Sequence, residues 1–156
     1  MEIKLAKESQ LLEVLYIIKE CTEQLIDKGV KSWHNMHADY SEIAKDINSK
    51  YVYIIFLKSV PVGTITIKPN AESSEASTIE RLAIFPHFQK RGLAKAMIEF
   101  AEKHSREKEY KRITGKIPVD DEPLCRLLED RGFVNMGTAQ SLPNELVKVN
   151  YEKRLV

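Results

Sequence analysis

Apolar residues recur every three or four positions in two long stretches of the chain, and this spacing predicts amphipathic helices. Residues suited to helix ends set the limits: Ser9, Ser41 and Asp121 are candidate N-caps, and Gly29 and Gly132 are candidate C-terminal glycines. Helices are therefore expected over residues 9–29, 42–47, 93–108 and 121–132.

Strands are predicted where β-branched and aromatic residues cluster, or where apolar and polar residues alternate. These stretches are residues 2–6, 51–57, 60–68, 78–84, 112–117, 133–138 and 146–154. The long helix connects the strands at 78–84 and 112–117, so these two should be parallel, with a right-handed crossover. A chain of 156 residues with this order of elements is expected to form a single α/β domain over residues 1–156.

A basic loop with a glycine joins the strand at 78–84 to the long helix. Pro86 ends the strand because proline cannot donate to a ladder, and residues 89–94 (Gln-Lys-Arg-Gly-Leu-Ala) then open the helix. The first turn of a helix presents unpaired N–H groups and partial positive charge, and Gly92 has no Cβ to keep a phosphate away. Lys90 and Arg91 add positive charge. The loop therefore predicts a phosphate or pyrophosphate site; the alternative is an ordinary helix start without a ligand.

Composition narrows the class of protein. With 24 basic and 23 acidic residues the net charge is +1, so no broad basic surface for nucleic acid is expected. No apolar run is long enough to span a bilayer, and the first four residues lack the apolar core of a signal peptide. The two cysteines, Cys21 and Cys125, form no C-x-x-C motif. A cytoplasmic protein with reduced thiols is expected, with Cys21 as a small core residue.

Residues 80–94 closely resemble the acetyl-CoA-binding motif of the GNAT superfamily of N-acetyltransferases, and residues 89–94 match its pattern Q/R-x-x-G-x-G/A. The resemblance implies a mixed, mostly antiparallel sheet of six to seven strands, flanked by about four helices, whose parallel strands splay at the cofactor cleft. It also implies acetyl-CoA as co-substrate. The cofactor-binding residues would be Leu82, Ala83, Ile84, Gln89, Lys90, Arg91, Gly92, Leu93, Ala94 and Asp121.

Residues 121–133 resemble the second signature of that family, N-x-P-A-x-x-x-Y-E-K-x-G-F, with two departures. Asp121 stands for the asparagine, and Leu128 stands for a tyrosine that assists the departing CoA thiolate in many members. Leucine has no group for this, although a thiol of pKa about 8.5 also leaves without an acid. Tyr151, Tyr40 and Cys125 are candidate substitutes.

Glu80 is the candidate general base, because many relatives draw their base from this part of the central strand. The alternative is that Glu80 is a surface residue paired with a lysine. The neighbouring Arg81 is expected to be a solvated charge.

Residues 30–40 contain groups that commonly contact ligands. Trp33, His34, His37 and Tyr40 are the candidate acceptor-binding wall; the alternative is that Trp33 and Tyr40 only cover the core. No metal is expected, because further ligands at suitable spacing are missing.

The resemblance thus implies an acetyl-CoA-dependent N-acetyltransferase acting on a primary amine of a small molecule or peptide, with no nucleic-acid or membrane partner. Leu128 and Asp121 keep a second hypothesis open, a non-catalytic CoA-binding or regulatory module on the same fold. Exposed strand edges also allow a homodimer.

Overall fold

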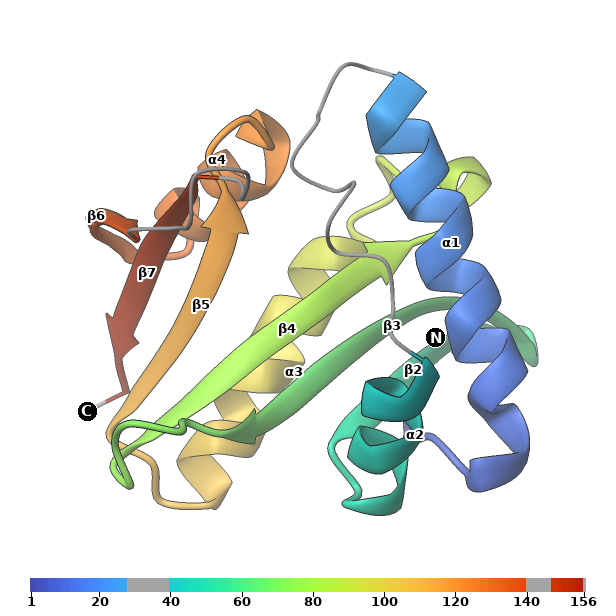
Figure 1. Ribbon diagram of the computed structural model, residues 1–156, viewed down its shortest axis with the longest axis horizontal. Helices are drawn as coiled ribbons and strands as arrows, with labels where there is room; N and C mark the ends of the chain where they lie inside the picture. Colours follow the sequence, from blue (N-terminus) through green and yellow to red (C-terminus); the bar gives the residue numbers. More distant parts are fainter. Residues whose placement is uncertain (28–39, 140–146, 156) are drawn as a thin grey trace.

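The computed structural model describes residues 1–27, 40–139 and 147–155 of the chain. Within these ranges seven strands form one sheet (Figure 1). The strands are β1 (Glu2–Leu5), β2 (Val52–Leu57), β3 (Val60–Pro69), β4 (Ala76–Ile84), β5 (Arg112–Pro118), β6 (Val134–Ala139) and β7 (Lys148–Arg154). Their order is β1-β2-β3-β4-β5-β7-β6, and every adjacent pair is antiparallel except β4 and β5. The predicted mixed, mostly antiparallel sheet is confirmed, as is the parallel pairing across the long helix.

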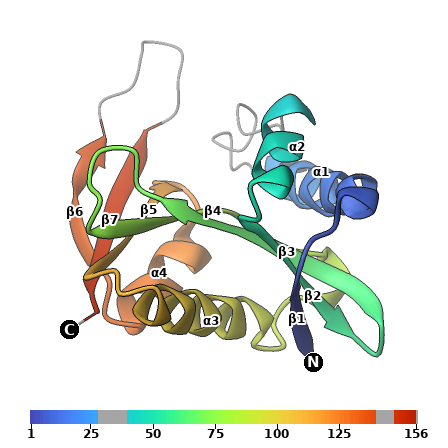
Figure 2. The ribbon, with the colours of Figure 1, turned by 90° about the horizontal axis from the view of Figure 1, so that it is seen from below.

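Helices cover both faces of the sheet. They are α1 (Leu11–Asp27), α2 (Tyr40–Asn48), α3 (Leu93–Glu107) and α4 (Glu122–Asp130), with short 3-10 helices η1 (Glu8–Gln10) and η3 (Pro86–Phe88). Figure 2 shows α1 and α2 on one face and α3 and α4 on the other. None of the described helices is both long and apolar enough to cross a membrane.

Two of the predicted N-caps are wrong and one is confirmed. Ser9 lies inside η1, whose N-cap is Lys7, because the Gln10 side chain accepts the Lys7 backbone N–H at 2.8 Å and starts the helix earlier. Ser41 lies inside α2, which begins at Tyr40. Asp121 does cap α4: its carboxylate accepts the Leu124 N–H at 3.4 Å.

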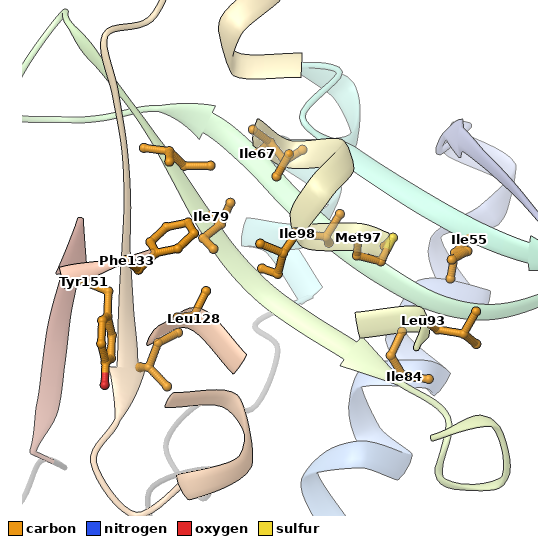
Figure 3. Packing of buried hydrophobic residues seen from close by; sticks show 14 of the residues in the cluster. Ile55, Ile67, Ile79, Ile84, Leu93, Met97, Ile98, Leu128, Phe133 and Tyr151 are labelled. Atoms are coloured by element: carbon orange, nitrogen blue, oxygen red, sulfur yellow. The ribbon is translucent and has the colours of Figure 1, made fainter. Parts of the chain in front are cut away.

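Two apolar cores, one on each face, hold the helices to the sheet. The larger core lies under α3 and α4, where Figure 3 shows Phe133 next to Ile79 and Tyr151 beside Leu128. The smaller core packs α1 and α2 against β2 and includes Cys21. Burial raises the pKa of the Cys21 thiol to about 12, and the thiol donates to the Ile84 carbonyl. The predicted core role of Cys21 is thus confirmed.

Candidate active site

The site forms where the two parallel strands separate. β4 and β5 pair only from Ala76 to Ile79 and from Arg112 to Gly115, and beyond these residues no described strand lies between them. Gly115 stands at the last pair, where an added Cβ would lie 3.0 Å from the Ile79 side chain. Figure 1 shows β4 and β5 diverging beyond this point. The predicted splay is confirmed, and it leaves one edge of β4 without a strand partner.

A β-bulge lies in the half of β4 that pairs with β3 but not with β5. Thr64 pairs with Ala83 and Thr66 with Glu80, so Arg81 and Leu82 together face a single residue of β3. Arg81 has a φ of +50°, a left-handed conformation that costs a non-glycine residue about 1–3 kcal/mol. The bulge interrupts the ladder between β4 and β3. On its opposite edge, beyond Ile79, β4 has no strand partner among the described residues, so the backbone groups on that edge face the gap between β4 and β5.

Ion pairs to α2 stabilise the bulge. The Arg81 guanidinium contacts Asp46 at 2.8 Å and Glu42 at 2.9 Å, and its side chain is 12% exposed. The expectation that Arg81 is a solvated charge is therefore wrong. The extra residue of the bulge interrupts the alternation of β4 and turns the Arg81 side chain toward α2, where two carboxylates neutralise it.

A cavity of about 370 Å³ lies over the gap. Its walls come from α2, the end of β3, the β3–β4 connection, β4, β5, α4 and β7. The lining residues are Glu42, Pro69, Asn70, Ala71, Glu72, Thr78, Ile79, Glu80, Arg81, Leu82, Lys116, Ile117, Pro118, Leu124 and Lys148. This volume lies within the range of small-molecule sites, toward its lower end.

Glu80, the candidate base, lines this cavity. Its side chain is 35% exposed, and its carboxylate lies 3.2 Å from the Lys68 ammonium. The pairing with a lysine that the alternative predicted is present. The role of Glu80 as general base stays a prediction. A half-exposed carboxylate beside the bulge can accept a proton from a molecule in the cavity.

A polar cluster that sequence reasoning missed closes the narrow end of the gap. The Asn70 side-chain amide donates to the Thr78 hydroxyl at 2.9 Å and to the Thr114 hydroxyl at 3.2 Å. The carbonyl oxygen of the same side chain accepts backbone N–H groups of the loop that follows. Asn70 is a turn-forming residue directly after a predicted strand, a signal for this local role but not for its contacts.

The basic loop lies at the far end of β4. Gly92 is the N-cap of α3 with a φ of +80°, and an added Cβ would meet nothing within 4 Å. The first α3 bond runs from the Ala96 N–H to the Gly92 carbonyl, so the N–H groups of Leu93, Ala94 and Lys95 have no helical acceptor. Open space in front of these donors is the geometry that a phosphate site requires.

The side chain of Gln89 holds this loop in place. Its amide donates to the Ile84 carbonyl at 2.8 Å and to the Gln24 side chain at 2.9 Å. Arg91 lies over the Phe88 ring, 5.3 Å from the ring centroid. Gln89 was predicted to bind the cofactor; the structure shows its side chain engaged within the protein, which leaves its backbone for that role.

The sequence profile of the acetyltransferase (GNAT) family matches residues 13–133, more than half of the chain. The chain belongs to the GNAT family. No curated protein matched the sequence.

Solved GNAT structures share the fold along almost the whole chain. An N-acetyltransferase from Staphylococcus aureus has a TM-score of 0.78 at 15% identity, covering 99% of this chain and 98% of its own. The PaiA N-acetyltransferase from Thermoplasma acidophilum, in complex with coenzyme A, has a TM-score of 0.80 at 16% identity, covering 98% of both chains. YncA from Salmonella typhimurium, solved with acetyl-CoA, has a TM-score of 0.76 at 13% identity, covering 100% of this chain and 94% of its own. The predicted family and fold are confirmed, and acetyl-CoA as co-substrate agrees with the family.

Leu128 occupies the position at which many GNAT proteins carry a tyrosine, and it is part of the apolar core. Leu128 is fully buried. The nearby Tyr151, a candidate acid, donates its hydroxyl to Glu129 at 2.6 Å. Its pKa is raised, first by burial and then by the hydrogen bond to Glu129. Burial likewise raises the pKa of the Cys125 thiol. Neither Tyr151 nor Cys125 lines the cavity, so their role as acids stays a prediction.

The other predicted site residues fall into three groups. Leu82 lines the cavity, while Ala83, Ile84 and Asp121 are buried and do not line it. Tyr40 is 59% exposed at the start of α2 and does not line the cavity. Trp33, His34 and His37 lie outside the described residues, so the acceptor wall predicted from them stays a prediction.

Proposed function

We propose that this GNAT protein transfers the acetyl group of acetyl-CoA to a primary amine of a small molecule or peptide. One observation carries the proposal: the splay between β4 and β5 occurs in the same chain as a positive-φ glycine at the start of α3. The backbone of Leu82–Ile84 would pair with the pantetheine arm, and residues 89–94 would bind the pyrophosphate. The cavity over the gap would hold the amine, together with Trp33, His34, His37 and Tyr40.

The chain's own residues have two roles in this reaction, proton transfer and stabilisation of the oxyanion. Glu80 takes a proton from the acceptor ammonium, which makes the nitrogen a nucleophile. The new N–C bond forms as the carbonyl oxygen gains charge, and backbone N–H groups at the β4 bulge stabilise that oxyanion. The C–S bond then breaks, the nitrogen gives up its remaining extra proton, and the CoA thiolate takes that proton up. A thiolate whose conjugate acid has a pKa of about 8.5 is a good leaving group, so an acid such as Tyr151 is not essential.

Thermal melting with acetyl-CoA, CoA and adenosine 3′,5′-bisphosphate tests the cofactor site. A ligand at a hundred times its dissociation constant should stabilise the protein by about 2.7 kcal/mol. Thiol release with a panel of primary amines then tests transfer. No stabilisation by any of the three ligands would contradict the phosphate assignment. Stabilisation without transfer to any amine would instead support a CoA-binding or regulatory module.

Gly92→Ala is expected to weaken CoA binding by more than tenfold, or about 1.4 kcal/mol, because the new Cβ points into the space assigned to the phosphate. The control is Gly137→Ala, since Gly137 also has a positive φ with nothing within 4 Å of an added Cβ. Both substitutions place a Cβ at a positive φ, +80° and +104°, so both variants carry backbone strain. Calorimetric titration with CoA should therefore separate them; equal affinities would show that Gly92 serves only the helix start.

A further inference from the structure

Two lysines form the wall of the cavity opposite β4. Lys116 lies on β5 and Lys148 on β7, and both line the cavity. Pro118 pairs with Lys148 across these antiparallel strands. Paired residues share a face of the sheet, and so do residues two apart on a strand, so the two ammonium groups lie diagonally on one face. Neither lysine forms an ion pair with any residue that the structure describes.

Two further cations, Arg81 in the cavity wall and Lys68 beside the cavity, do form ion pairs. Arg81 is neutralised by Asp46 and Glu42, and Lys68, next to the cavity, is neutralised by Glu80 and Asp46. Lys116 is exposed and Lys148 is half-buried, so water solvates both ammonium groups. Since no described carboxylate occupies them, an anionic group that enters the cavity can pair with both.

The opposite wall of the cavity is acidic. Glu42 comes from α2, Glu72 from the β3–β4 connection and Glu80 from β4, and all three line the cavity. On the side of β4 and α2, three carboxylates (Asp46, beside the cavity, is the third) face two cations, Arg81 and Lys68, so the net charge there is negative. The side of β5 and β7 carries the two lysines. A small molecule that carries one ammonium and one anionic group matches this separation of charge.

We infer that the acceptor is an amine that also bears a carboxylate or a phosphate, such as a free amino acid, a short peptide or an aminoalkyl phosphate. Its ammonium lies toward Glu80 and the β4 bulge, and its anionic group pairs with Lys116 and Lys148. The inference rests on the proposed function and adds the substrate class. A volume of about 370 Å³ suits a molecule of this size.

The test compares matched acceptors: amino acids with their carboxamides, phosphoethanolamine with ethanolamine, and spermidine as a purely cationic amine. We expect kcat/KM to be at least tenfold higher for the anionic member of a pair. In the double variant Lys116→Met/Lys148→Met, the ratio of kcat/KM for the anionic member to kcat/KM for its uncharged or cationic counterpart should fall close to one. The KM for acetyl-CoA should be unchanged. The control is Lys50→Met/Lys58→Met, which removes two exposed turn lysines outside the cavity and should keep the preference.

Each contrary outcome has a distinct meaning. Equal use of both members, or a preference for spermidine, would overturn the inference and leave the N-acetyltransferase proposal intact. A rise in the KM for acetyl-CoA in the double lysine variant would assign these lysines to the cofactor and also overturn it. Failure to acetylate any amine would remove the proposed function, and the inference with it. Stabilisation of the variant by acetyl-CoA in a thermal melt shows that it is folded.

Discussion

Replacing Glu80 by glutamine is expected to lower kcat for amine acetylation by about 100-fold or more, because general-base catalysis contributes roughly 10²–10⁴-fold. Glutamine keeps the size of the side chain and its place in the cavity wall, but it cannot take up the proton of an ammonium. Thiol release at saturating acetyl-CoA measures the loss. Binding of acetyl-CoA should be unchanged, because the contacts proposed for it on β4 and in the cofactor loop come from backbone groups and not from the Glu80 side chain.

Lys68→Met separates this role from a structural one. Lys68 is 3.2 Å from Glu80, so both variants break the same ion pair. If Glu80 is the base, Lys68→Met keeps a carboxylate in the cavity and loses far less activity than Glu80→Gln. Losses of similar size, accompanied by similar losses in stability to urea, would give the pair a structural role alone and require another base.

Local patterns in the sequence were sufficient for most elements of the fold. The apolar run in residues 78–84 and the glycine at 92 predicted a strand, a turn and a helix start, because each depends on neighbours in the chain. The parallel pairing of β4 and β5 followed from the length of the helix between them. The cofactor loop was found for the same reason: its donors, charges and glycine are consecutive in sequence.

The features missed depend on contacts between distant segments. An inserted residue in β4 turns Arg81 toward carboxylates on α2, and a period-two pattern over so short a strand does not reveal such a bulge. Lys116 and Lys148 are far apart in the chain, and only the register of β5 and β7 brings them to one face. Helix ends were also misplaced by one or two residues, since Ser9 and Ser41 are each good caps in isolation.

The helix opposite the cavity gives the largest expected loss of stability. Glu102 of α3 is 2% exposed, and its carboxylate accepts hydrogen bonds from Arg131 at 3.1 and 3.2 Å and from the Lys153 ammonium. These contacts tie α3 to the end of α4 and to β7. Glu102→Ala is expected to lower the free energy of unfolding by about 3–5 kcal/mol, because it leaves two poorly solvated cations side by side. Urea denaturation measures the change.

Glu99→Ala is the matched control for this prediction. Glu99 lies one turn earlier on the same helix, and its carboxylate is 3.9 Å from the same arginine, but its side chain is 48% exposed. A solvated ion pair of this kind contributes at most about 1 kcal/mol. Both substitutions introduce the residue with the highest helix propensity, so propensity does not separate them. A loss for Glu102→Ala no larger than that for Glu99→Ala would show that burial adds little to this network, and that the apolar core alone holds α4 in place under the cavity.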